Sequence, residues 1–239
     1  MRKLGRLLGL IALAVLALQL YFLLRIALMA VADPASTTFQ RSEIRRIVAS
    51  TGGLAWRQDW VPMSRISANL PRAVIASEDA GFADHSGIEW DAVEQAWGKN
   101  QRAERVAERR GKKAAAKVVG GSTISQQLAK NLFLSGERHL PRKAQEAVLT
   151  LMLETVLSKQ RILEIYLNHV EWGEGVFGAQ AAARHYFRTD AVQLGAYQAA
   201  RLAVMLPAPK RFEKRPASAY LSGRAGTIVA RMNDVELPQ

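Results

Sequence analysis

Two adjacent carboxylates, Glu78 and Asp79, lie where a predicted helix that begins near Pro71 ends, and a short turn from Gly81 to Gly87 follows them. A carboxylate at a helix C-terminus feels the negative end of the helix dipole, and a neighbouring carboxylate adds repulsion between like charges. Both effects raise the pKa of Glu78, which makes it a candidate general base. The alternative is an ordinary acidic pair on the surface.

A glycine pair and a polar helix start come next, in the segment from Gly120 to Asn131. Free backbone N–H groups at a helix start and the positive end of its dipole favour an anion. Ser122, Gln126 and Lys130 recur every four residues, so they share one stripe of the helix. This stripe suits a phosphorylated sugar, and the alternative is an ordinary amphipathic helix capped by Ser122 or Thr123.

A basic cluster follows, in which Arg138, Arg142 and Lys143 come shortly before Glu146. Arg142 and Glu146 have the i,i+4 spacing of an ion pair on a helix surface, and such exposed pairs contribute little to stability. The same residues would also suit the neutralisation of a diphosphate, with a second carboxylate nearby. Spacing alone leaves both interpretations open.

Other features exclude several kinds of site. The four histidines, at positions 85, 139, 169 and 185, include no pair spaced to bind a metal from one helix face, so a zinc enzyme is not expected. The chain has no cysteine, which excludes disulfides and thiol nucleophiles. The segment from Gly173 to Gly178 matches the dinucleotide fingerprint, but it follows a predicted helix, so we expect a tight connection between helices instead.

The elements that position these side chains are predicted to be mainly helices. The Ala144–Leu157 segment has apolar residues on most turns, which predicts a helix in the centre of the core. Few segments alternate in the manner of strands, so the fold class is mainly α. Helical periodicity and capping residues predict helices from Asn69 to about Ser77 and over Trp90–Trp97, Thr123–Phe133, Ala144–Leu157, Lys159–Asn168, Ala179–Tyr186 and Gln193–Leu206.

The N-terminal 32 residues differ in composition from the rest. Between Leu7 and Leu24 the only polar side chain is Gln19, and apolar residues continue past Arg25. About 20 helical residues cross the ~30 Å core of a bilayer, so we expect an uncleaved transmembrane anchor. A cleaved signal peptide is the alternative, because 30–32 reads Ala-Val-Ala. The basic residues at positions 2, 3 and 6 predict a cytoplasmic N-terminus and a domain on the other side of the membrane.

The net charge of +12 on 239 residues suggests a polyanionic partner. For a domain outside the plasma membrane we expect anionic lipids and lipid-linked phosphates, and no nucleic acid. Eight basic residues lie between Lys99 and Lys117. Such a run is typical of a solvated helix or loop, and a membrane-facing lip is the functional alternative.

The predicted organisation is a basic tip and anchor over 1–32, a linker leading into the domain over 33–60, and a catalytic domain over 61–239.

The order of these motifs resembles that of the bacterial peptidoglycan glycosyltransferases, which polymerise lipid II. The resemblance covers roughly Arg72 to Pro216 and implies a lysozyme-like domain, with a head lobe, a smaller membrane-dipping jaw lobe and the active cleft between them. The residues that carry it are 78–87, 120–131, 142–146, 162–168 and Gly173, Gly178, Ala181, Ala182, Tyr186 and Phe187.

The resemblance also implies roles for individual residues. Glu78 would be the general base that takes the proton from the sugar 4-hydroxyl of the acceptor lipid II, while the growing chain loses undecaprenyl diphosphate in one inverting displacement that forms a β-1,4 bond. Glu146 would be the second essential acid, orienting the cations or a divalent metal such as Mg²⁺ or Mn²⁺, although the sequence requires no cofactor. Diphosphate binding would fall to Lys130, Arg138, Arg142 and Lys143, and substrate positioning to Ser122, Gln126 and Gln127.

Two departures from the family pattern are visible. Ser125 replaces the more usual Thr, and Gln145 stands where some relatives carry a further Lys, which suggests weaker binding of the diphosphate there.

The sequence contains no Ser-x-x-Lys and no Lys-Thr-Gly motif, so we expect a monofunctional enzyme without a transpeptidase domain. The expected location is the bacterial inner membrane, with the catalytic domain in the periplasm. Its expected partners are lipid II, the growing glycan chain, membrane lipids and other cell-wall synthesis proteins.

Two alternatives share the fold. A lysozyme-like muramidase or lytic transglycosylase would cut the same glycan, but a hydrolase has no need of a cation cluster for a diphosphate. An inactive membrane-anchored scaffold of the cell-wall machinery would have no need of Glu78 and Glu146.

Overall fold

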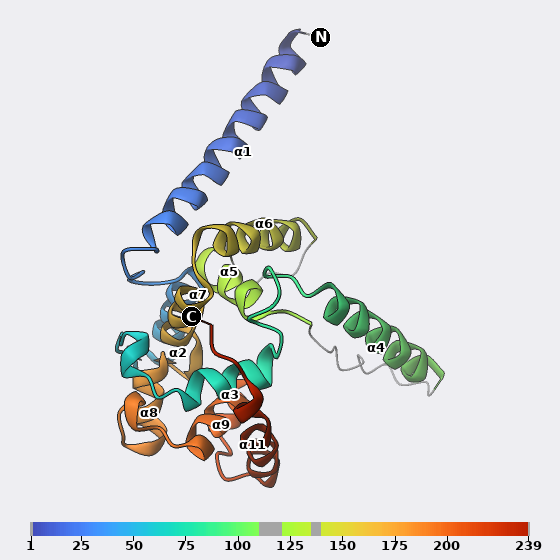
Figure 1. Ribbon diagram of the computed structural model, residues 1–239. Coiled ribbons are helices and arrows are strands. Elements are labelled where there is room, and N and C mark those ends of the chain that lie inside the picture. The colour runs from blue at the N-terminus through green and yellow to red at the C-terminus, as the bar shows by residue number, and fades with distance from the viewer. Residues whose placement is uncertain (1, 110–120, 135–139, 239) are drawn as a thin grey trace.

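The computed structural model describes residues 2–109, 121–134 and 140–238, and regular structure in these ranges is mainly helical (Figure 1), which confirms the predicted class. The helices are α1 (Arg2–Leu28), α2 (Thr38–Thr51), α3 (Asn69–Glu78), α4 (Trp90–Arg109), α5 (Ile124–Phe133), α6 (Leu140–Val156), α7 (Lys159–His169), α8 (Ala179–Phe187), α9 (Ala196–Met205), α10 (Pro209–Glu213) and α11 (Ala219–Arg231). Short 3₁₀ helices are η1 (Met63–Arg65), η2 (Ala191–Gln193) and η3 (Met232–Asp234), and the strands are β1 (Arg57–Gln58), β2 (Glu171–Gly173) and β3 (Val176–Phe177).

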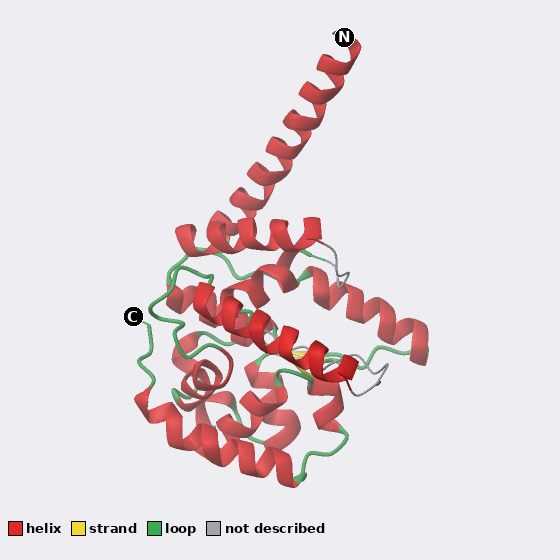
Figure 2. Ribbon diagram, turned by 90° about the vertical axis from the view of Figure 1, so that its right-hand side faces the viewer, coloured by secondary structure: helices red, strands yellow, loops and turns green. Residues whose placement is uncertain are grey.

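Helix α1 projects from one end of a helical body, and α9 and α11 lie at the opposite end (Figures 1 and 2). Its apolar side chains are exposed along most of its length, from Leu4 to Leu24. The helix is long and apolar enough to cross a membrane. An apolar surface of this length is unfavourable in water and favourable in a lipid bilayer, so the structure is compatible with the predicted single-pass anchor.

The C-terminal end of α1 is joined to the body. Ile26 and Met29 are buried in the core. Arg161 of α7 donates hydrogen bonds to the carbonyl oxygens of Met29 (2.8 Å) and Ala32 (3.1 Å) and forms a 2.7 Å ion pair with Asp33. The chain that leaves α1 is therefore fixed against α7 at several points.

The segment that follows contains α2 and β1. The side chain of Thr37 accepts a hydrogen bond from the backbone N–H of Gln40, and the Gln40 side chain accepts one from Thr37, which forms a capping box at the start of α2. Helix α2 packs on α5. The predicted division of the chain at residues 32 and 60 stays a prediction.

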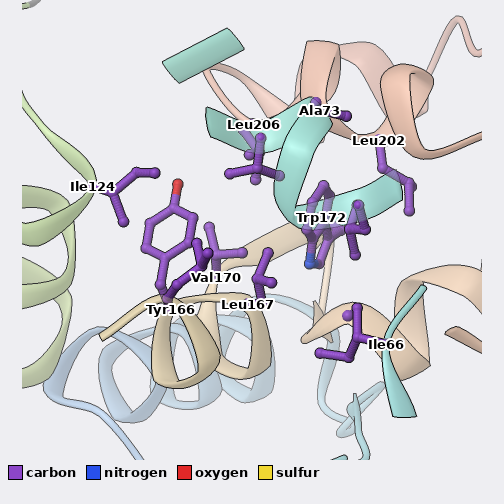
Figure 3. Packing of buried hydrophobic residues seen from close by; sticks show 14 of the residues in the cluster. Ile66, Ala73, Ile124, Tyr166, Leu167, Val170, Trp172, Leu202 and Leu206 are labelled. Atoms are coloured by element: carbon purple, nitrogen blue, oxygen red, sulfur yellow. The ribbon is translucent and has the colours of Figure 1, made fainter. Parts of the chain in front are cut away.

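Helices α3, α9 and α11 pack together in one part of the core and α5, α6 and α7 in another, and one cluster of buried side chains includes residues of both groups. Alanines at the contact between α3 and α9, including Ala73, Ala199 and Ala203, are fully buried and let the two backbones approach closely. Figure 3 shows Tyr166, Leu167 and Val170 on one side of this core, with Trp172 packed beneath Ala73 and Leu202.

Two sequence predictions about helices are wrong in part. Helix α6 is not wholly inside the core, because Val148 is 41% and Leu151 50% exposed, while Leu149 and Leu153 are buried. One face of α6 is turned toward α1, on the side of the body from which α1 rises (Figure 1). The helix predicted over 193–206 starts later, as α9 at Ala196, because Gln193 ends η2 and Gly195 is the N-cap of α9.

The glycine-rich segment that connects α7 to α8 forms a β-hairpin, as part of a sheet with strand order β1-β3-β2. Strand β3 pairs antiparallel with β2 and parallel with β1, with Arg57 opposite Val176. Gly175 has φ +69°, and a Cβ there would lie 2.0 Å from the carbonyl oxygen of Ala55. The glycines thus serve a tight connection between helices, as predicted.

Candidate active site

A cavity of about 370 Å³ brings together most of the residues singled out from the sequence. Its walls come from α2, α5, α6, strand β2, the start of α10 and the segment before it. The predicted site residues that line it are Ser122, Gln126, Gln127, Lys130, Arg142, Lys143 and Glu146. Arg138 lies outside the described residues.

The N-terminus of α5 is organised by Thr123. The Thr123 hydroxyl accepts a 3.1 Å hydrogen bond from the backbone N–H of Gln126, and the side-chain oxygen Oε1 of Gln126 accepts one of 3.1 Å from the backbone N–H of Thr123. Of the two predicted N-cap residues, Ser122 and Thr123, it is therefore Thr123 that caps α5. Gln126 and Lys130 lie one turn apart on α5, and Ser122 precedes the helix, so it does not belong to the predicted stripe, although all three residues line the cavity.

Glu78 is the last residue of α3 and is half-buried. The amide nitrogen of Gln127 donates a 3.0 Å hydrogen bond to its carboxylate. Burial raises the pKa of Glu78, the charge of Asp79 raises it further, and the hydrogen bond from Gln127 lowers it, with a raised pKa as the result. The predicted direction is confirmed, and the largest cause is burial, which the sequence pattern did not reveal.

Tyr166 of α7 sets the orientation of Gln127. Its buried hydroxyl donates a 3.0 Å hydrogen bond to the carbonyl oxygen of Gln127, so the NH₂ group of that amide is left to face Glu78. Figure 3 shows this hydroxyl pointing away from α7 toward Ile124 of α5. Burial raises the pKa of Tyr166 well above its usual value, so the phenol remains a proton donor. Nothing in the spacing of Tyr166 marked it as part of the site.

Asp79 is buried and joins three segments. One carboxylate oxygen accepts a 2.8 Å hydrogen bond from the backbone N–H of Ile124, in the first turn of α5, and the other lies 2.8 Å from Nε2 of His85. The backbone N–H of Gly87 donates to Nδ1 of His85, so a neutral ring carries its proton on Nε2 and donates it to Asp79. The interpretation of 78–79 as a surface acidic pair is therefore wrong, because Asp79 anchors the start of α5 beside Glu78.

Glu146 is buried in α6 between two cations. Its carboxylate oxygens lie 2.9 Å from Arg142 and 2.5 Å from Lys143. Only 3% of Glu146 is exposed, so the interpretation as an ordinary surface pair does not hold for this carboxylate. A buried carboxylate that is bound on both sides fixes the two cations at the cavity wall.

Glu171 of β2 is a further carboxylate at the cavity that sequence reasoning missed. It is buried and lies 3.3 Å from the ammonium group of Lys210. The pKa of Glu171 is raised to about 7. Burial is the largest cause, the charges of Glu43 and Glu174 also raise the pKa, and Lys210 lowers it. In the sequence Glu171 lies between the predicted helix that ends at Asn168 and the glycine at position 173, outside every motif that indicated catalysis.

The basic run from Lys99 to Lys117 lies partly on α4, where Lys99, Arg102 and Arg105 are exposed, and its part from residue 110 onward is outside the described residues. The same helix exposes Trp90 (71%) and Trp97 (68%). The described part of the run is therefore an exposed helix, and both a solvated helix and a membrane-facing lip stay predictions.

The donor set offers little to a divalent metal. Both oxygens of Glu146 are already bound by cations. Among the residues that the structure describes, no group of three or more His, Asp or Glu side chains is arranged to hold a metal. Mg²⁺ is commonly bound by one or two carboxylates together with substrate phosphates, so a divalent cation that binds with the diphosphate stays a prediction.

Comparison with known proteins identifies the family. The model of the family described as Transglycosylase matches residues 45–233. The chain is 54% identical over 245 residues to the biosynthetic peptidoglycan transglycosylase of Ralstonia nicotianae, covering 100% of this chain and 99% of that relative. It is 53% identical over 230 residues to the protein of the same name from Burkholderia thailandensis (96% and 86% covered), and 52% identical over 226 residues to that from Herminiimonas arsenicoxydans (95% and 93%). With its mainly helical, lysozyme-like domain, the chain belongs to the transglycosylase family of peptidoglycan glycosyltransferases.

Proposed function

We propose that this protein polymerises lipid II into β-1,4 glycan strands by a single inverting displacement with Glu78 as the general base. The observation that carries the proposal is the contact of Gln127 with Glu78. Gln127 lines the cavity and donates a hydrogen bond to a carboxylate of raised pKa. A base of raised proton affinity thus lies beside a cation-lined cavity, which is the combination that the reaction needs.

In the proposed reaction Glu78 takes the proton of the 4-hydroxyl of the acceptor lipid II. The freed oxygen forms a bond to the anomeric carbon of the growing chain, and the bond between that carbon and the diphosphate oxygen breaks. Undecaprenyl diphosphate leaves with the electron pair of that bond. It needs no proton if cations neutralise it, so one base is sufficient.

The cations proposed to hold the diphosphate are Lys130, Arg142 and Lys143, with Arg138 as a further candidate from the sequence. Glu146 lies within 3 Å of both Arg142 and Lys143, which supports a role in orienting them. Ser122, Gln126 and Gln127 line the same cavity and are the residues proposed to position the sugars. No step of the proposal is assigned to a metal.

We further propose that α1 spans the inner membrane with its N-terminus in the cytoplasm, and that the rest of the chain acts in the periplasm on lipid-linked substrate. The basic residues before the apolar run and the exposed apolar surface of α1 support this orientation. Membrane lipids and other cell-wall synthesis proteins are the partners that such a location makes available, and no feature of the cavity calls for nucleic acid.

The test is the incubation of the full-length protein, in lipid vesicles, with labelled lipid II. Long glycan strands are expected from the wild type and from the control Glu236→Gln, whose carboxylate is exposed near the C-terminus. Glu78→Gln should make none. Cleavage of preformed strands without polymerisation would favour the lytic alternative, and the absence of both activities would favour a scaffold.

A further inference from the structure

The polar residue inside the apolar run of α1 has a specific partner in the catalytic body. The side-chain amide of Gln19 donates a 2.9 Å hydrogen bond to the amide oxygen of Gln145 on α6, and the amide of Gln145 donates one of 3.0 Å back to Gln19. The two residues are 126 positions apart in the chain. Each amide therefore satisfies the other in a closed pair.

Such a pair matters most where no water can replace it. Gln19 lies among exposed leucines on a helix that is proposed to span the bilayer, and an amide without a partner in hydrocarbon is costly. Because Gln145 supplies both the donor and the acceptor, α6 must lie at the level of the apolar segment of α1. Figure 1 shows α6 running across the top of the body, beside the base of α1.

Two further contacts hold α1 against the body on the C-terminal side of Gln19. The ring of Phe22 lies 5.3 Å from that of Phe133, at the end of α5, in an edge-to-face arrangement. The guanidinium group of Arg25 lies 5.5 Å from the centre of the same ring. Together with the hydrogen bonds from Arg161, these contacts dock the helix in one orientation, which a flexible tether would not have.

The partner of Gln19 is the residue directly before Glu146. Successive residues of an α-helix point about 100° apart, so turning Gln145 toward α1 turns Glu146 toward the cavity. Gln145 does not line that cavity, whereas Arg142, Lys143 and Glu146 do. The rotation of α6 that satisfies the amide pair is thus the rotation that presents the cation cluster.

We propose that Gln19 is a positioning residue for glycosyl transfer, whose amide pair with Gln145 fixes the rotation and depth of α6 against the membrane helix and so holds the Glu146 cluster at the cleft. This inference rests on the proposed function and on α1 spanning the membrane. The proposal also gives Gln145 a role. The sequence showed only that Gln145 replaces a Lys that some relatives carry, and in the structure it is the partner of Gln19.

A double-mutant cycle on the full-length protein in lipid vesicles tests the energetic part. Gln19→Leu and Gln145→Leu should each lower kcat for lipid II polymerisation about three- to tenfold, the range expected for one or two hydrogen bonds within a membrane. KM should stay within about twofold, because the diphosphate ligands themselves remain. The double variant should be no worse than either single variant, since both remove the same pair. The control is Gln160→Leu, at an exposed glutamine of α7.

The absence of cysteine from the chain permits a direct test of position. Gln19→Cys/Gln145→Cys should have the low kcat of the single variants and should be joined by a short bis-methanethiosulfonate linker in vesicles. Joining the two helices should restore kcat, and reduction of the linker should lower it again. The pair Leu10→Cys/Gln145→Cys should not be joined, because Leu10 lies about 13 Å farther along α1.

Wild-type kcat in both single variants, the absence of a link between positions 19 and 145, or a link that restores no activity would each overturn the positioning role. Failure of the wild type to polymerise lipid II would overturn the proposed function instead. The positioning role would fall with it, while the link would still report the contact between α1 and α6.

Discussion

The amide of Gln127 donates a 3.0 Å hydrogen bond to the carboxylate of Glu78. This hydrogen bond favours the ionised form of Glu78, whereas burial and the charge of Asp79 oppose it, and the pKa remains raised. A general base must be ionised to accept a proton and must hold that proton strongly enough to remove it from a hydroxyl group. The opposing effects at Glu78 serve these two needs.

Glu78→Gln should abolish polymerisation and stabilise the fold at neutral pH. A carboxyl group whose pKa is higher in the folded than in the unfolded state binds more protons when folded, so the stability of the protein falls as pH rises through that pKa. The neutral amide of Glu78→Gln cannot ionise, so the variant avoids this loss of stability. The melting temperature at pH 8 should rise by about 2–4 °C for each kcal/mol relieved, and at low pH, where Glu78 is protonated in both states, the gain should vanish. A lower melting temperature of the variant at pH 8 would contradict the raised pKa.

Gln127→Met should move the acidic limb of the pH–rate profile to higher pH. The substitution removes the hydrogen bond that lowers the pKa of Glu78, so burial and the charge of Asp79 raise that pKa further. The measurement is kcat/KM for lipid II between pH 5 and 9, with a greater loss at the acidic end. Tyr166→Phe, which removes only the group that orients the amide, should cause a smaller shift in the same direction. An unchanged limb in Gln127→Met would show that Glu78 is not the titrating base.

The sequence predicted several helices whose ends carry clear local signals. Helix α5 starts after the capping box of Thr123, and α7 starts after Ser158, whose hydroxyl accepts a hydrogen bond from the backbone N–H of Arg161. Helices α2, α10 and α11 were not predicted. Helix α2 buries only Gln40, Glu43 and Ile47, so it has no apolar stripe, and α10 is five residues long. Helix α2 nevertheless begins at a capping box, and α11 has the Ser218 cap and an apolar stripe of Leu221, Ala225 and Ile228, so both carry local signals that the prediction missed, whereas α10 depends on packing.

The members of the site could be predicted where they lie close together in sequence, as in α5 and α6. Contacts between distant segments could not. Asp79 reaches Ile124 across 45 positions, and Tyr166 reaches Gln127 across 39. The burial of Glu78 and of Glu171, which is the largest cause of each raised pKa, likewise depends on segments that only the folded chain brings together.

Asp79→Ala should reduce both stability and activity. It removes the acceptor of the Ile124 N–H group and of the His85 ring, and hydrogen bonds to a buried charged group contribute about 1.5–3 kcal/mol each. The melting temperature should fall by at least about 5 °C, and kcat should fall because α5 carries Gln127 and Lys130. His85→Ala, which removes one of the two contacts, should cause a smaller loss, and an equal loss would show that Ile124 does not depend on Asp79.

Ionisation of Glu171 should weaken the binding of lipid II as pH rises through neutrality. Its pKa of about 7 means that this carboxyl group is mostly neutral at pH 6 and mostly charged at pH 8, and the added negative charge lies in the wall of the cavity proposed to hold a diphosphate. KM should rise about three- to tenfold over this range, which corresponds to roughly 0.7–1.4 kcal/mol of repulsion, with a smaller change in kcat.

Glu171→Gln should keep KM constant over the same pH range, because the neutral amide cannot ionise. The control Glu236→Gln alters an exposed carboxylate near the C-terminus that does not line the cavity, so it should retain the rise. Any change in the ionisation of lipid II itself is common to all three proteins and cancels in their comparison. If KM rose equally in Glu171→Gln and in the wild type, the repulsion would come from another group, and Glu171 would have no part in substrate binding.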